Sequence, residues 1–169
     1  VAGSEQTFAE LMNAHAKRLG MNNSHFTNAT GLPDPEHYTT ARDMAAVTAA
    51  LILEFPDYYV WDGTKEFEYN GIKQQNRNRL LWRDPTVDGV KTGYTQNAGY
   101  CLVASAKRED MRLISVVMGT SGPEARAQAS LELLNYGFRF YESHRLYAAE
   151  TPVENLRVWM GDVQELPVG

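Results

Sequence analysis

Residues 87–95 read Val-Asp-Gly-Val-Lys-Thr-Gly-Tyr-Thr, a strand-like stretch that ends in a lysine, a hydroxyl and a glycine. Lys91 can offer a positive charge to a ligand carboxylate, and Thr92 can donate an O–H hydrogen bond to it. Gly93 has no side chain, so a ligand can lie against the strand edge at that position. A Lys-Thr-Gly triplet alone is short enough to occur by chance, and an exposed lysine before a turn is the competing interpretation.

Two more strand-like segments follow this stretch, at residues 99–107 and 112–118, and a short polar turn near residues 109–110 separates them. Successive apolar strands joined by short turns favour antiparallel pairing. Together with residues 87–92, these segments predict an antiparallel meander.

A helix is predicted after the third strand. Ser121 and Glu124 form a capping-box pattern, and Gly137 is a natural helix stop. We assign the buried face to residues with helical spacing, which are Ala125, Ala129, Leu133 and Tyr136. The helix is expected to end at about Tyr136 and to pack on the sheet.

The sequence before residue 87 predicts two helices, a loop and a hairpin. The first helix is capped by Thr7 with Glu10 and stops at Gly20. Residues 21–39 are rich in turn-forming residues and predict a long ordered loop. A second helix is capped at Thr40 and runs to about residue 54, and Asn-Gly at residues 70–71 predicts a surface hairpin.

The composition is that of a globular chain of ordinary size. Its 169 residues fit one domain, or one domain with a fragment of another, and 43% hydrophobic with 22% charged residues exclude a disordered or rod-like protein. A formal charge of −5 argues against nucleic acid as a partner, because clustered Lys and Arg normally hold it. The four histidines lack metal-ligand spacing, so we expect no metal and no cofactor. Trp82 is expected in the core or at an interface.

The residues beyond Glu142 differ in character, with short alternating pieces punctuated by Pro and Gly. We therefore divide the chain into a first domain, residues 1–142, and the beginning of a β-rich second domain, residues 143–169. The second segment is too short to bury a core of its own, so we expect this domain to be truncated. Neither a signal peptide nor a membrane anchor is expected in this chain.

The order of elements resembles the end of the catalytic domain in serine penicillin-binding proteins and β-lactamases, whose signatures include Lys-Thr-Gly. Further segments extend this resemblance over nearly the whole chain: residues 3–5, 19–26, 40–45, 76–82, 87–93, 98–100 and 112–119. They are similar to low-molecular-mass serine-type D-alanyl-D-alanine carboxypeptidases, the penicillin-binding protein 5/6 group of peptidase type S11. The implied fold is α/β of the α+β type, a penicillin-binding protein/β-lactamase-like fragment with helices on an antiparallel sheet and the start of a small β domain.

The chain departs from this family at its nucleophile. The family needs Ser-x-x-Lys and Ser-x-Asn motifs, and none of the serines begins either pattern: they stand at positions 4, 24, 105, 115, 121, 130 and 143. In the family both motifs precede the Gly-Ser-Glu segment, so we expect a fragment that begins just downstream of them. A naturally truncated, inactive relative is the alternative.

The resemblance implies acyl transfer, in which a serine attacks the D-Ala-D-Ala carbonyl and water hydrolyses the acyl-enzyme. Lys91, Thr92 and Gly93 are implied to bind the terminal carboxylate. The backbone N–H of Tyr94 is implied to belong to the oxyanion hole. Arg77 and Arg126 match family arginines near the site, although Arg126 could equally belong to a surface ion pair. The loop at residues 21–38 is implied to border the site.

The resemblance also implies partners and location. The expected ligands are peptidoglycan stem peptides that end in D-Ala-D-Ala, and β-lactam antibiotics. The missing N-terminal segment, or another copy of the chain, is expected to pair with the strand near residues 112–118, which otherwise exposes an apolar edge. Such enzymes work outside the cytoplasmic membrane, so a periplasmic location peripheral to the inner membrane is implied. A catalytically inactive peptidoglycan-binding or structural module is the alternative function.

Overall fold

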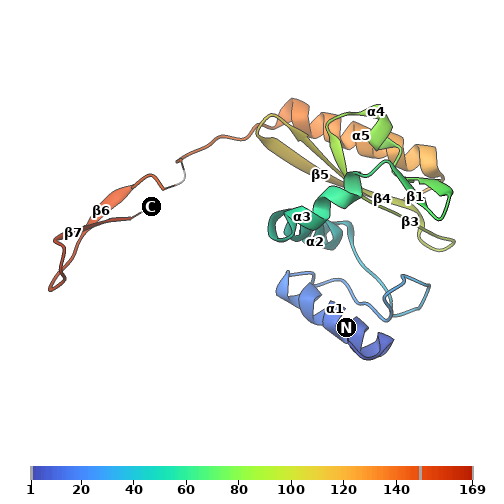
Figure 1. Ribbon diagram of the computed structural model, residues 1–169, viewed down its shortest axis with the longest axis horizontal. Coiled ribbons are helices and arrows are strands. Elements are labelled where there is room, and N and C mark those ends of the chain that lie inside the picture. The colour runs from blue at the N-terminus through green and yellow to red at the C-terminus, as the bar shows by residue number, and fades with distance from the viewer. Residues whose placement is uncertain (1, 149, 169) are drawn as a thin grey trace.

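A three-stranded antiparallel sheet lies at the centre of the computed structural model, which describes residues 2–148 and 150–168. Its strands are β3 (Val87–Thr95), β4 (Gly99–Arg108) and β5 (Met111–Thr120), and they pair in the order β3-β4-β5. Helix α5 (Pro123–Phe140) covers one face of this sheet, and α2 (Ala41–Glu54) lies on the other (Figure 1). The predicted meander and the predicted α+β arrangement are confirmed.

Alternation along β4 divides the core between the two faces of the sheet. Leu102 and Ala104 point toward α5 and pack in one cluster with Ala127 and Leu134. The intervening Val103 belongs to a second cluster, against which Leu51 and other residues of α2 pack. Because successive side chains of a strand point to opposite faces, a nearly continuous apolar strand is what a sheet covered on both sides requires.

Helix α5 differs from the prediction at both ends. Its N-cap is Gly122, which has no side chain to accept a hydrogen bond, and the helix begins with Pro123 instead of being capped by Ser121. The helix continues past the predicted end to Phe140, so Gly137 lies inside it, where a Cβ atom would meet Leu113 Cδ1 at 2.5 Å. This glycine therefore serves close packing against β5 and does not stop the helix.

The buried face of α5 is also different from the predicted one. Leu133 and Tyr136 are 50% and 56% exposed. The buried residues are Arg126, Ala127, Ser130 and Leu134. The prediction chose the wrong one of two apolar stripes, since Ala127, Leu131, Leu134 and Phe138 also have helical spacing and are the residues that pack on the core.

Helix α1 (Glu5–Arg18) begins three residues earlier than predicted. Ser4 is its N-cap, and the Ser4 side chain accepts a hydrogen bond from the amide of Thr7. Thr7 is therefore inside the helix and is not its cap. The predicted cap of α2 is confirmed, since Thr40 Oγ1 accepts from the amide of Asp43 at 3.2 Å.

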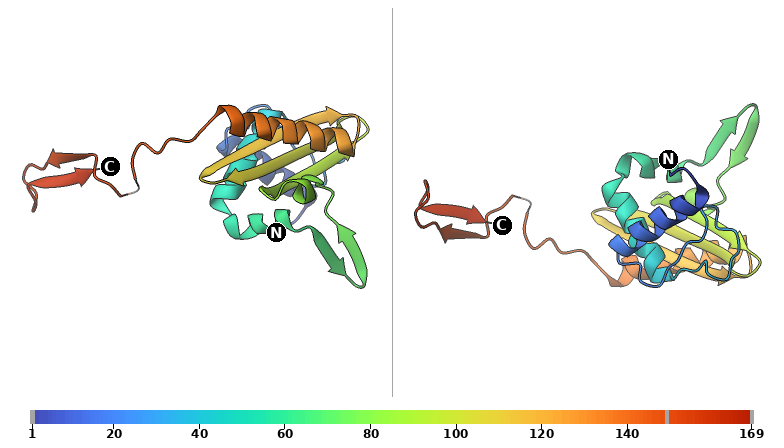
Figure 2. Two further views of the ribbon diagram at one scale, coloured as in Figure 1. Left: turned by 90° about the horizontal axis from the view of Figure 1, so that it is seen from above. Right: turned by 90° about the horizontal axis from the view of Figure 1, so that it is seen from below.

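The predicted hairpin is confirmed and projects from the body of the molecule (Figure 2). It consists of β1 (Glu66–Tyr69) and β2 (Ile72–Gln75), and both turn residues have positive φ, 51° at Asn70 and 76° at Gly71. The sequence did not predict the one-turn helices around it. They are α3 (Pro56–Tyr59), the 3₁₀ helix η1 (Val60–Gly63) and α4 (Leu80–Arg83).

After α5 the chain runs away from the sheet to a separate two-stranded ladder (Figure 1). This ladder pairs β6 (Glu154–Arg157) with β7 (Glu165–Val168). The division into domains at residue 142 stays a prediction. Across the part of the chain that the structure describes, no helix is both long and apolar enough to cross a membrane.

Candidate functional site

Two adjoining cavities, of about 860 and 320 Å³, flank the second half of β3. Arg77 and Thr92 line both of them. Gly93, Tyr94 and Arg126 line the larger cavity, and Lys91 lines the smaller one. The structure thus brings together all six residues that the sequence analysis selected. Their roles in binding and catalysis stay predictions.

Strand β3 is an edge strand, which leaves its outer edge open toward a ligand. Among the described strands it pairs only with β4, in a register that sets Lys91 opposite Val103 and Gly93 opposite Cys101. Lys91 is exposed, and its ammonium group donates to the carbonyl of Thr92 at 2.7 Å. A Cβ atom at Gly93 would meet only Cys101 Cβ, at 4.0 Å. Internal packing therefore does not require this glycine, whereas close approach of a ligand backbone would.

The beginning of β3 is fixed by a charged network around Asp88. Arg112, from β5, donates to both carboxylate oxygens, and Tyr59 donates to Asp88 Oδ1 at 2.5 Å. Arg112 also donates to Ser105 Oγ at 2.7 Å. Burial, together with the hydrogen bond to Asp88, raises the pKa of Tyr59. The hydrogen bond to Asp88 raises the pKa of Arg112, so this guanidinium stays charged over the physiological pH range.

The segment between β2 and α4 is attached to β3 by Asn78, and Asn76 holds Asn78 in turn. Asn78 is fully buried, and its amide nitrogen donates to the carbonyl of Gly89 at 2.8 Å. Asn78 Oδ1 accepts from the amide of Leu80, and Asn76 Oδ1 accepts from the amide of Asn78. These bonds hold the backbone on both sides of Arg77, so its exposed side chain lines both cavities.

Arg126 joins three parts of the site although only 5% of it is exposed. Its Nη1 donates to the carbonyls of Gly93 at 3.2 Å and Cys101 at 3.3 Å, and its Nη2 donates to the carbonyl of Arg77 at 3.5 Å. Burial lowers the pKa of this guanidinium. No carboxylate of the described residues pairs with it, so the surface ion pair considered for Arg126 is wrong.

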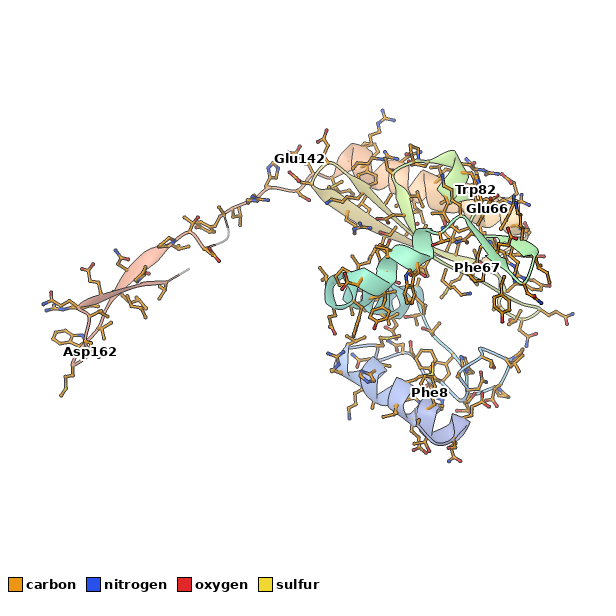
Figure 3. The ribbon with its side chains drawn as sticks, in the orientation of Figure 1. Phe8, Glu66, Phe67, Trp82, Glu142 and Asp162 are labelled. Carbon is orange, nitrogen blue, oxygen red and sulfur yellow. The ribbon has the colours of Figure 1, made fainter. Side chains whose placement is uncertain are left out.

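Aromatic side chains form a wall of the larger cavity. Tyr94 is 59% exposed, and its ring lies 4.3 Å from that of Tyr100, its partner across the ladder. Trp82 lines the same cavity and is exposed, so of the two places expected for it, core or interface, the core is excluded (Figure 3). Apolar periodicity could not distinguish a cavity wall from a core position here, because α4 is a single turn.

A further basic group borders this cavity. Arg79 and Arg83 line it, and both donate to the carboxylate of Glu124, with Arg83 making two hydrogen bonds of 2.6 and 2.7 Å. Arg77 and Arg126 have no such carboxylate among the described residues. The cavity wall therefore carries more positive than negative charge, which suits an anionic ligand.

The sequence analysis missed Asp62, which lines the smaller cavity together with Lys91 and Arg77. Burial raises the pKa of its carboxyl, and the positive charge of Lys91 partly opposes this. No local motif marked this residue, because η1 is a single turn. The sequence analysis also missed the charged network of Asp88, Arg112 and Tyr59, because these residues meet only in the folded chain.

The loop at residues 21–38 packs against the two N-terminal helices. Asn13 on α1 exchanges two hydrogen bonds with the backbone of Phe26, and Asp43 on α2 accepts from Ser24 Oγ and from the amide of Asn23. No described residue of this loop lines either cavity. Its expected place at the border of the site is therefore not found among these residues.

The fold and the Lys-Thr-Gly strand agree with a match to the peptidase S11 family, D-alanyl-D-alanine carboxypeptidase, over residues 1–122. The chain belongs to this family, which confirms the resemblance noted from its sequence. It is 48% identical to D-alanyl-D-alanine carboxypeptidase DacC of Escherichia coli K12 over 170 residues, which are 100% of this chain and 42% of DacC.

Solved structures agree with this assignment. Penicillin binding protein 5 from Haemophilus influenzae has a TM-score of 0.89 at 42% identity, over 99% of this chain and 49% of that protein. Penicillin-Binding Protein D2 from Listeria monocytogenes, in its ampicillin-bound form, has a TM-score of 0.73 at 32% identity, over 78% of this chain and 55% of that protein. The chain thus spans about half the length of these relatives.

Proposed function

We propose that this chain is the substrate-binding part of a serine D-Ala-D-Ala carboxypeptidase, which removes the terminal D-alanine from peptidoglycan pentapeptides through an acyl-enzyme. The observation that carries the proposal is the gathering of Lys91, Thr92, Arg77 and Arg126 around the open edge of β3. Lys91, Thr92 and Arg77 can hold a peptide carboxylate by charge and by hydrogen bonds, and Arg126 holds the strand behind them. The family relationship supplies the reaction type.

In this mechanism the residues of the chain bind and orient, and a serine on another segment of the full-length protein attacks. Lys91 and Thr92 engage the terminal carboxylate of the substrate. The N–H of Tyr94 donates to the developing oxyanion, and loss of one such donor typically costs about 10²–10³ in rate. Arg126 supports the site from behind β3, because it holds the carbonyls of Gly93 and Cys101. The chain by itself is inactive, since none of its serines begins a nucleophile motif.

β-Lactams are proposed as further ligands of the same site, because a relative carries ampicillin in its solved structure. The segment that supplies the nucleophile, or another copy of the chain, is the proposed partner of β5, which has a neighbour on only one side among the described strands. The proposed location is the periplasmic side of the inner membrane, where the peptidoglycan substrate lies.

The test is the substitution Lys91→Ala in the full-length protein. A charge-assisted hydrogen bond is worth about 1.5–3 kcal/mol, so kcat/KM for a peptide that ends in D-Ala-D-Ala is expected to fall by about 10- to 100-fold. Lys73→Ala on β2 is the matched control, because it removes the same charge from an exposed position outside both cavities. Unchanged turnover in the Lys91 variant, or no turnover and no labelling by a fluorescent penicillin in the unmodified protein, contradicts the proposal.

A further inference from the structure

A carboxylate lies within the cavity that is proposed to hold a substrate carboxylate. Asp62, on η1, lines the smaller cavity with Lys91 and Arg77, and it is the one acidic side chain among the lining residues of either cavity. A site that serves only to attract anions gains nothing from a negative charge at this position. The presence of Asp62 therefore needs an explanation of its own.

The position of Asp62 is fixed by the backbone around it. Asn76 Nδ2 donates to the carbonyls of Asp62 at 3.3 Å and Thr64 at 3.0 Å, which attaches η1 to the segment that carries Arg77. Gly63 lies so close to β3 that a Cβ atom there would meet the carbonyl oxygen of Asp88 at 2.9 Å. The turn is thus held against the strand that carries Lys91.

The carboxylate of Asp62 is half-buried, and it forms no hydrogen bond or ion pair with any described side chain or backbone group. Lys91 from β3 and Arg77 from the segment before α4 are the other charged groups that line its cavity. Asp62 therefore acts on these cations through space, without the short contact that would neutralise Lys91.

We propose that Asp62 is a specificity-determining residue that weakens the hold of Lys91 on carboxylates and so limits the affinity of the site for acidic substrates and for the acidic product. This inference rests on the function proposed above. A ligand carboxylate that approaches Lys91 is attracted by its ammonium group and repelled by Asp62. Because the same repulsion acts on the released amino acid, Asp62 favours product departure. A ligand without terminal charge is not subject to the repulsion.

The test compares charged and neutral ligands in the full-length protein with Asp62→Asn. Dissociation constants are measured by NMR titration for N-acetyl-D-alanine and for its carboxamide, and KM and kcat are measured for a peptide that ends in D-Ala-D-Ala. The variant is expected to bind N-acetyl-D-alanine about three- to tenfold more tightly and to lower KM by a similar factor. Binding of the carboxamide and kcat are expected to stay within about twofold.

Two further variants make the result specific. Asp62→Ser removes the same charge with a smaller side chain and is expected to behave like Asp62→Asn. Asp57→Asn makes the same charge change at an exposed position of α3 outside both cavities and is expected to change nothing. The inference is overturned if affinity for the acid is unchanged or weaker, if acid and carboxamide gain equally, or if neither protein binds the acid. If Lys91→Ala lowers kcat/KM as proposed, but the Asp62 variants bind the acid and turn over the peptide like the unmodified protein, only the role of Asp62 is overturned.

Discussion

Arg112 and Asp88 form a two-point ion pair, with Nη1 to Oδ1 at 2.8 Å and Nη2 to Oδ2 at 2.7 Å. The pair joins the two outer strands of the sheet across β4, because Asp88 lies on β3 and Arg112 on β5. It fixes the beginning of the strand whose middle carries Lys91. The geometry of the candidate site therefore depends on residues that line neither cavity.

Asp88→Asn is expected to lower the free energy of unfolding of the full-length protein by about 1–2 kcal/mol, because it leaves Arg112 and Tyr59 with a weaker common acceptor. Denaturant unfolding measures the change. Asp110→Asn in the exposed β4–β5 turn is the control and should have no effect. A stability equal to that of the unmodified protein would show that the pair contributes nothing to the fold.

Gly89→Ala is expected to destabilise the protein by about 1–3 kcal/mol, because the new Cβ would lie 2.7 Å from Tyr59 Oη, which Asp88 holds in place. Gly93→Ala is the matched comparison on the same strand. It meets only Cys101 Cβ at 4.0 Å and should leave the unfolding midpoint unchanged while raising KM. Equal loss of stability in the two variants would contradict this reading of β3.

Arg126→Lys is expected to lower kcat/KM by about 10-fold or more, because one ammonium group cannot reach the carbonyls of Gly93, Cys101 and Arg77 together. Arg126→Gln, which also removes the charge, should lower it further. Arg139→Lys near the exposed end of α5 is the control. Full activity of Arg126→Lys would show that the planar guanidinium is not needed.

Asp43→Asn is expected to lower the melting temperature at pH 7, with a difference that shrinks as the pH falls. The hydrogen bond from Ser24, with those from the amide of Asn23 and from Thr40, lowers the pKa of Asp43 below the ordinary value of 3.8. The ionised carboxylate therefore stabilises the fold above pH 3.8, and this contribution is lost as the pH falls through the lowered pKa. Melting curves between pH 7 and pH 3 measure it, and a difference that does not depend on pH would contradict the assignment.

The sequence predicted the main elements because their signals are local. Strand alternation at residues 87–118, the cap at Thr40 and the Asn-Gly turn each depend on neighbours along the chain, and all three were confirmed. The helix ends were harder. The glycine inside α5 reflects packing against Leu113 of β5, which no window of the helix sequence contains.

The candidate site likewise has a part that the sequence could predict and a part that it could not. Its Lys-Thr-Gly strand and its two arginines could be selected from the sequence, because the family resemblance marks them. The environment that positions these residues could not be predicted from the sequence. Arg126 is buried beneath carbonyl oxygens from three segments, and Trp82 lines the cavity, although periodicity alone assigned neither place.

By itself, the sequence determined the order of the elements, the meander and the chemistry available at residues 91–93, since these follow from residue types and their local spacing. Only the tertiary structure decided which distant groups act on that chemistry. Asp62, Asp88 and Arg112 lie up to 50 residues apart along the chain. Their charges meet at β3 because the sheet and the turn η1 fold together, and the Coulomb energy between charges depends on their distance in space and not on their separation in sequence.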